Sequence, residues 1–110
     1  MIDLKRLLFI EPKFGASRLP FLDEYTRRMA AAFRASTQCP EGYLGWHECV
    51  CGARSETHDF TLPGGQETNS LCVHYLAHHR AEVPADQLRR VMQLPDAEVT
   101  PTTQELSGHR

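Results

Sequence analysis

Residues 46–79 read WHECVCGARSETHDFTLPGGQETNSLCVHYLAHH, and this stretch decides the predicted fold. It holds three of the four cysteines and five of the six histidines in fewer than a third of the 110 residues. Thiolate and imidazole together are the donors that Zn²⁺ prefers in proteins. The concentration therefore predicts a module organised around one divalent metal ion, zinc.

The first pair of candidate ligands is Cys49 and Cys51, which are separated by one residue. Residues 43–51 alternate between apolar residues and donors, which predicts a strand with one buried face and one face toward the metal. The apolar face comprises Leu44, Trp46 and Val50, and the donor face His47, Cys49 and Cys51. Gly52 suits a tight turn that brings both sulfurs onto one ion. The pair is a weaker signal than Cys-x-x-Cys, because structural zinc sites usually space their ligands by two to four residues.

The second pair of candidate ligands lies on a predicted helix over residues 71–80. DFTL-PGG-QET predicts a β-hairpin before it, and Thr68, Asn69 and Ser70 are three candidate N-caps. His74 and His78 are one helical turn apart and share a face. His79 lies nearer the centre of the apolar face but needs some distortion of the last turn to join His74. Both pairings stay open, with a narrow preference for His79.

The predicted ligand set is therefore Cys49, Cys51, His74 and His79, with His78 and His47 as alternatives. The remaining cysteines and histidines have other expected roles. Cys72 lies on the apolar helix face and is more typical of a core residue than of a ligand. Cys39 lies beside a proline and is not expected to bind metal, and His58 and His109 are expected in solvated loops.

The strings HECVCGARS, LPGG and TNSLCVHYLAHHRAEVP resemble small uncharacterised bacterial proteins with an H-x-C-x-C-G element and a T-N-S-L-x-V-H-Y-x-x-x-H-R helix. This resemblance covers residues 47–84 and implies no particular activity. It places His74 and His79 at the two helix histidines and His78 at an unspecified position. The order of elements, with donors near a turn followed by a hairpin and a helix, is also similar to that of treble-clef zinc modules. The Cys-x-Cys spacing and the lack of a Cys-x-x-Cys pair at the helix start depart from those modules.

The remaining chain predicts an α+β fold around the zinc-stabilised hairpin and helix. An amphipathic helix begins near Pro20, with apolar residues at helical spacing from Leu22 to Phe33. Residues 38–42 break it, and a second C-terminal helix is expected from Pro84 to Leu94. Residues 2–10 fit either a helical turn or an edge strand. The predicted division is an N-terminal segment (1–38), the zinc module (39–94) and a C-terminal tail (95–110).

Composition excludes several classes of protein. Hydrophobic residues make up 41% and charged residues 24% of the chain, which argues against disorder. LLFI near the N-terminus is too short for a signal peptide or a membrane span. A cytoplasmic location is therefore expected, and reduced thiols there favour metal ligation over disulfides. A secreted protein with two disulfides is the alternative.

Three functions are compatible with a zinc module. A basic segment 1–38 precedes an acidic remainder within a net charge of −2. We expect a structural ion in an accessory protein that binds a partner protein, or a second copy, with the outer faces of its first and last helices. Nucleic-acid binding through arginines of those helices is the second candidate, although the acidic remainder opposes it. A zinc-dependent hydrolase is the third, but HECVC lacks the second histidine of HExxH, and no H-x-E with P-C-x-x-C motif occurs.

Overall fold

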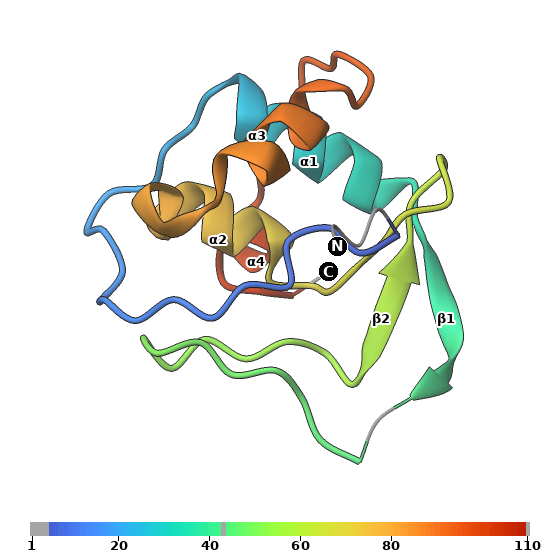
Figure 1. Ribbon diagram of the computed structural model, residues 1–110, viewed down its shortest axis with the longest axis horizontal. Helices are drawn as coiled ribbons and strands as arrows, with labels where there is room; N and C mark the ends of the chain where they lie inside the picture. The colour runs from blue at the N-terminus through green and yellow to red at the C-terminus, as the bar shows by residue number, and fades with distance from the viewer. Residues whose placement is uncertain (1–4, 43, 110) are drawn as a thin grey trace.

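The computed structural model describes residues 5–42 and 44–109, and its central element is the short helix α2 (Cys72–His78). Residues 72–77 of α2 are all buried, because α1 (Glu24–Arg34), α4 (Thr103–Leu106) and the 3₁₀ turn η1 (Arg80–Glu82) contact it. Figure 1 shows α2 surrounded by these elements, with the strands to one side. Helices and an antiparallel sheet within the described ranges confirm the predicted α+β class.

The sheet is antiparallel, with the order β1 (Thr37–Gly42), β2 (His58–Thr61) and β3 (Glu67–Thr68). β2 and β3 form the predicted hairpin, and Gly65 in its turn has φ +93°. Lys5 and Leu7 each hydrogen-bond to Glu67 through the backbone, at 2.6 and 2.8 Å. The N-terminal segment therefore runs along the edge of β3, which agrees with the edge-strand alternative. Residues 2–4 of that prediction lie outside the described part of the chain.

One prediction about the segment after α1 is wrong. Residues 38–42 follow the end of the helix, as expected, and belong to the edge strand β1, whose register shifts between Gln38 and Gly42. An edge strand with an irregular register tolerates Pro40. The strand expected over 43–51 is absent in residues 44–51, where one isolated bridge joins Glu48 to Arg54. Its apolar face is not buried, since Leu44, Trp46 and Val50 are 112%, 49% and 56% exposed.

The helices before and after α2 in the chain agree more closely with those predicted from the sequence. α1 begins at Glu24 rather than near Pro20, because the Asp23 side chain accepts a hydrogen bond from the Thr26 amide in a capping box. α3 (Ala85–Met92) has Pro84 as its N-cap. None of the three predicted caps of α2 serves that purpose; Leu71 precedes the helix without a side-chain cap.

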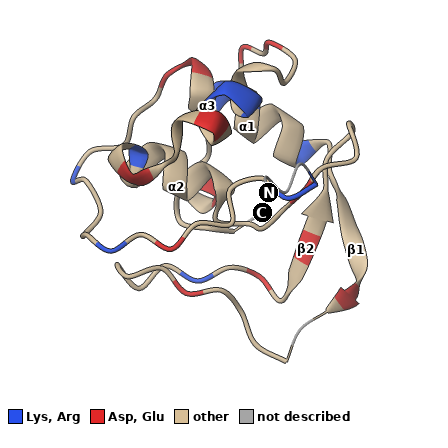
Figure 2. Cartoon of the chain, viewed as in Figure 1, with Lys and Arg blue, Asp and Glu red and all other residues tan. Residues whose placement is uncertain are grey.

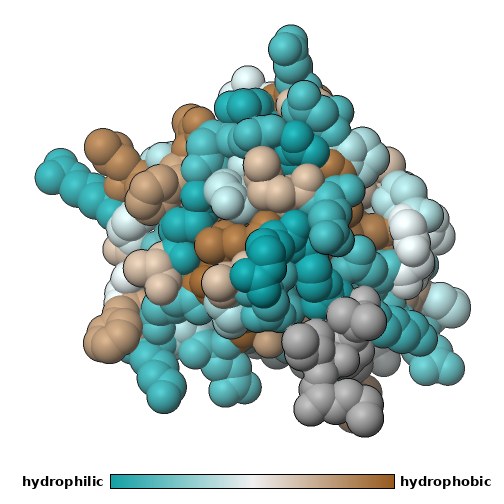
Figure 3. Space-filling view, turned by 45° about the horizontal axis from the view of Figure 1, so that its top comes forward, coloured by the Kyte–Doolittle hydropathy of each residue, from teal (hydrophilic) through white to brown (hydrophobic). Residues whose placement is uncertain are grey.

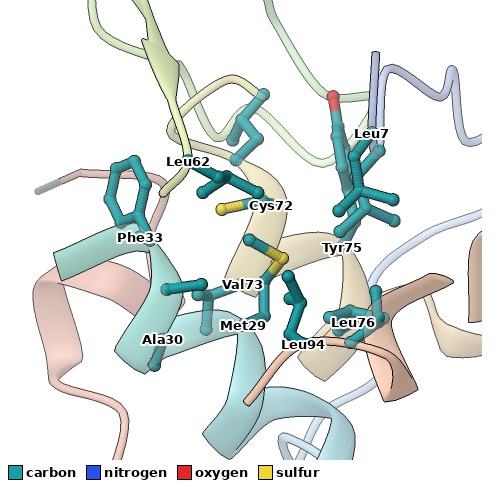
Figure 4. Packing of buried hydrophobic residues seen from close by; sticks show 14 of the residues in the cluster. Leu7, Met29, Ala30, Phe33, Leu62, Cys72, Val73, Tyr75, Leu76 and Leu94 are labelled. Atoms are coloured by element: carbon teal, nitrogen blue, oxygen red, sulfur yellow. The ribbon is translucent and has the colours of Figure 1, made fainter. Parts of the chain in front are cut away.

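The apolar core lies between α1, α2 and the sheet. Met29, Ala30 and Phe33 of α1 face Cys72, Val73 and Leu76 of α2 in Figure 4, and all six are fully buried. The rings of Phe33 and Phe60 meet edge to face, 4.9 Å apart, and join α1 to β2. The core therefore fixes the position of α2 independently of any bound ion.

The predicted C-terminal tail contains α4 and folds back over α2. Glu105 of α4 is 3% exposed and bonds to Arg34 of α1 at 2.7 and 2.8 Å. Arg80 similarly bonds to Asp23 through two contacts of 2.7 Å. Basic and acidic residues are thus interspersed in Figure 2, and part of the charge asymmetry along the sequence is paired internally. No helix in the described ranges is long and apolar enough to span a membrane.

Candidate metal centre

The structure brings together four side chains that could hold a metal ion: Cys49, Cys51, His74 and His79. One donor atom from each lies within 4.8 Å of the other three. Cys49 and Cys51 come from the loop before β2, His74 from the first turn of α2 and His79 from the residue after α2, so segments far apart in the sequence meet here. The arrangement of donors from a turn and a helix is therefore present in the fold.

The segment 47–55 forms a tight knuckle that orients both sulfurs. Its two arms are joined by backbone hydrogen bonds of 2.8 Å from Cys49 to Ala53 and from Ser55 to His47. The Gly52 amide donates to the Cys49 carbonyl at 2.8 Å, and Gly52 has φ +96°. Residues with a Cβ rarely adopt this conformation. The predicted turn at Gly52 is confirmed, although the strand before it is not.

Helix α2 and the residue that follows it supply the two imidazoles. α2 ends at His78, and His79 leaves helical geometry with φ −130° and ψ 34°. His74 Nε2 lies 3.2 Å from Cys51 Sγ, and His79 Nε2 lies 3.1 Å from Cys49 Sγ. In a tetrahedral zinc site with bonds of about 2.0–2.3 Å, neighbouring sulfur and nitrogen atoms are roughly 3.5 Å apart. A small expansion of the cluster would therefore admit the ion.

One hydrogen bond outside the cluster orients His74, and a carboxylate lies near the outer nitrogen of His79. His74 Nδ1 lies 2.9 Å from the Leu106 carbonyl, which can only accept, so Nδ1 carries the proton and Nε2 presents its lone pair to the sulfurs. Metal-binding histidines usually have their second nitrogen held in this way. His79 Nδ1 is buried and lies 3.8 Å from Glu82 Oε2, slightly beyond hydrogen-bond length. A small movement of the Glu82 carboxylate would complete the same arrangement.

Burial determines the protonation of three of the four side chains. It lowers the pKa of His74 and His79, which keeps both imidazoles neutral near pH 7, and raises the pKa of the Cys49 thiol. A metal ion would therefore have to displace a thiol proton from Cys49. Cys51 is exposed and borders an open depression of about 360 Å³. One sulfur of the cluster is thus accessible from solvent.

The alternative histidines lie outside the cluster. His78 Nδ1 donates to the Ser17 carbonyl at 2.8 Å, and its ring centre is 5.3 Å from that of His74. His47 Nε2 is 3.6 Å from the Asp59 carboxylate in β2. Their positions favour roles beside the cluster over direct ligation.

The other cysteines and histidines differ in their surroundings. Cys72 is fully buried in the core, as expected, and burial raises its pKa to about 12. Cys39 Sγ lies 3.4 Å from the Thr61 hydroxyl, away from the cluster. His58 was expected in a solvated loop but lies half-buried in β2, whereas His109 is exposed. All four cysteines are free thiols.

Sequence reasoning missed both groups that lie beside the outer nitrogens of the two imidazoles. Glu82 follows His79 by three residues, and this spacing was a usable signal because such residues are neighbours on a helical surface. The Leu106 carbonyl is a backbone group 32 residues from His74. No pattern of side chains could have indicated it.

Comparison with known protein families, curated proteins and solved structures finds no match to this chain. The inference about function therefore depends on the geometry of the site and on the surface around it.

Proposed function

We propose that this protein binds one Zn²⁺ through Cys49, Cys51, His74 and His79, and that the ion is structural. The convergence of two thiols and two imidazoles within 4.8 Å carries the proposal. Two sulfur and two nitrogen donors suit tetrahedral zinc better than Mg²⁺ or Ca²⁺, which prefer oxygen ligands. The set also fills all four positions of a structural site.

The proposal includes a treble-clef-like module related to the small bacterial H-x-C-x-C-G proteins. The order of knuckle, β2–β3 hairpin and α2 supports it. His74 lies in the first turn of α2, but the other donor, His79, follows the last helical residue, which would make this a variant of the treble-clef arrangement. In either arrangement the ion would clamp the knuckle to α2.

Purified protein is expected to contain about one zinc per chain, the stoichiometry of one closed four-ligand site. Metal analysis would measure the content, and replacement by Co²⁺ would give absorption bands of tetrahedral cobalt bonded to thiolate. His79→Ala should lose the metal, since its Nε2 is among the converging atoms.

His78→Ala is the matched control because His78 is adjacent but bonds to Ser17 instead. Wild-type protein without metal, or an equal loss in both variants, would refute this ligand set.

We further propose that the zinc-stabilised domain acts in the cytoplasm by binding a partner protein. Free thiols support a reducing compartment. Large apolar side chains are exposed on two loops: Phe14, Leu19, Phe21 and Leu22 on one, and Leu44, Trp46 and Val50 on the other. Apolar side chains also protrude among hydrophilic ones on the face in Figure 3. Such groups favour protein contact, and we infer that the partner surface lies on these loops rather than on the helix faces first predicted.

Nucleic-acid binding receives less support from the same surface. The candidate arginines are Arg27, Arg28, Arg34, Arg80, Arg89 and Arg90. Four of these six, Arg28, Arg34, Arg80 and Arg90, make hydrogen bonds within the protein. Guanidinium groups engaged in this way are less available to neutralise phosphates.

The partner proposal can be tested by capture from native cells. A Phe14→Ser, Leu19→Ser double variant should recover a specific partner at least about tenfold less well, because truncating interface anchors costs more than 1.4 kcal/mol. Both side chains are more than 70% exposed, so folding should be unaffected.

Ala85→Ser, at an exposed position outside both loops, is the control for the effect of an added surface hydroxyl. Recovery of salt-sensitive nucleic acid in place of protein would contradict the proposal.

A further inference from the structure

A second cavity, of about 310 Å³, is lined by none of the four clustered donors. The N-terminal segment, the start of the knuckle and α2 contribute to its walls. Its lining includes Arg6, Phe9, Glu11, His47, Asn69 and Tyr75. Two of these residues, Asn69 and Tyr75, are almost completely buried.

Tyr75 is 2% exposed, and its hydroxyl has no hydrogen-bond partner among residues 5–42 and 44–109. In Figure 4 its ring lies at the edge of the core and its oxygen points out of the apolar cluster, past Leu7. A buried hydroxyl that borders a cavity is a donor that needs an acceptor.

Asn69 provides a second donor on the same wall. It is 1% exposed, and its Oδ1 accepts a 2.8 Å hydrogen bond from the Leu71 amide. This bond fixes Nδ2 on the other side of the amide group. Nδ2 makes one long contact, 3.5 Å, with the Leu8 carbonyl. Because an amide nitrogen carries two hydrogens, at least one remains for a group inside the cavity.

Arg6 adds a positive charge at the rim. Its guanidinium carbon lies 3.8 Å from the centre of the Phe9 ring, and within the described chain no carboxylate pairs with it. A guanidinium stacked on an aromatic ring keeps its in-plane N–H groups available for a planar, bidentate acceptor. Glu48, which also borders the cavity, already contacts Arg54 at 3.3 Å. The Glu11 carboxylate, which also borders the cavity, offsets the positive charge of Arg6, so the net charge at the rim is close to zero.

We propose that this cavity binds a small organic monocarboxylate. Its two oxygens would accept hydrogen bonds from Arg6, Asn69 and Tyr75, while the Phe9 ring would pack against an apolar body. The Glu11 carboxylate disfavours a doubly charged phosphate, whereas one negative charge is matched by one guanidinium. The site differs from the metal centre in both residues and chemistry.

The proposal can be tested by titrating ¹⁵N-labelled, metal-loaded protein with sodium benzoate and following amide resonances. Benzamide has the same shape without the charge and is the matched control ligand. Benzoate should give saturable shifts at millimolar concentrations in residues 6–11, 47–48, 69 and 75, and benzamide should not.

Two variants assign the contacts. Arg6→Gln should weaken benzoate binding about tenfold or more, since it removes a charge-assisted bidentate contact. Tyr75→Phe keeps the buried ring and should weaken binding about threefold to tenfold. Arg18→Gln, at an exposed position elsewhere, should have no effect.

Absence of saturable shifts, equal binding of benzamide, or an equal loss in Arg18→Gln would overturn the proposal. The metal content of each sample is measured separately. Failure of the carboxylate site is therefore distinguishable from failure of the zinc proposal.

Discussion

The Cys49→Ser variant is expected to lose its metal and the part of its stability that depends on the metal. Cys49 is 3% exposed, and its sulfur lies 3.1 Å from His79 Nε2. A serine hydroxyl is a poor zinc ligand beside two imidazoles. The remaining three donors would then form an incomplete site.

The size of the effect follows from mass action. An ion that binds only the folded state stabilises it by about 4.1 kcal/mol when its free concentration is a thousand times the Kd. Urea denaturation of wild-type protein should therefore show about that gain between chelator and buffered zinc. Cys49→Ser should show none of it. The apolar core around Phe33 and Leu76 is independent of the ion, so we expect the metal-free protein to retain helical circular dichroism.

Cys39→Ser is the matched control, because its sulfur contacts Thr61 and lies outside the cluster. It should keep both the metal and the zinc-dependent gain. One equivalent of zinc in Cys49→Ser, or the same zinc-dependent gain as in wild-type protein, would show that the cluster is not the metal centre.

The sequence was most informative where chemistry and local spacing coincide. Cys49 and Cys51 flank one residue before a glycine, and a turn at Gly52 was enough to bring their sulfurs together. The preference for His79 over His78 rested on the apolar face of the helix. That preference also required distortion at the helix end, and the structure has it at His79. These inferences depend on contacts within a few residues.

Alternation was misleading in residues 43–51 because a period of two does not ensure a partner strand. Leu44 and Val50 are exposed, and β2 pairs with residues 37–42 instead. Pairing between strands is a property of the assembled sheet, and an edge position allowed Pro40 in β1. Local propensity could not show which segment would occupy that edge.

The C-terminal residues illustrate a second limit. DAEVTPTTQELSGHR has the composition of a tail, yet Glu105 is buried and bonds to Arg34, 71 residues earlier in the chain. The neighbouring Leu106 carbonyl holds His74. Contacts over such distances leave no periodic signal, so neither the burial of α4 nor its part in the site could be predicted.

Replacing Glu105 by glutamine is expected to affect both stability and the metal centre. Its carboxylate bonds to the Arg34 guanidinium at 2.7 and 2.8 Å and accepts from the Thr102 amide at 2.8 Å. Hydrogen bonds to charged groups contribute about 1.5–3 kcal/mol. Because the Arg34 side chain is 39% exposed, solvent screening reduces that value, and we expect a loss of about 2 kcal/mol at pH 7.

The loss should depend on pH in a defined direction. Burial raises the pKa of Glu105, but the Arg34 and Thr102 contacts outweigh it and hold the pKa below 4.5. The folded state therefore binds this proton less readily than the unfolded state. The stabilisation is fully present above pH 4.5 and is lost as the pH falls through the folded-state pKa. The difference between wild type and variant in urea denaturation should shrink accordingly in acid.

The same substitution tests whether α4 supports the metal centre. If loosening α4 releases the Leu106 carbonyl from His74 Nδ1, zinc affinity should fall about tenfold, the lower end of the effect of removing such an orienting contact. Competition with a chromophoric chelator at pH 7 would measure it. Glu98→Gln, at an exposed position, is the control and should change neither quantity. Lower stability with unchanged zinc affinity would mean that the Leu106 carbonyl stays in place without the Arg34–Glu105 ion pair. In that case α4 would support the fold but not the metal centre.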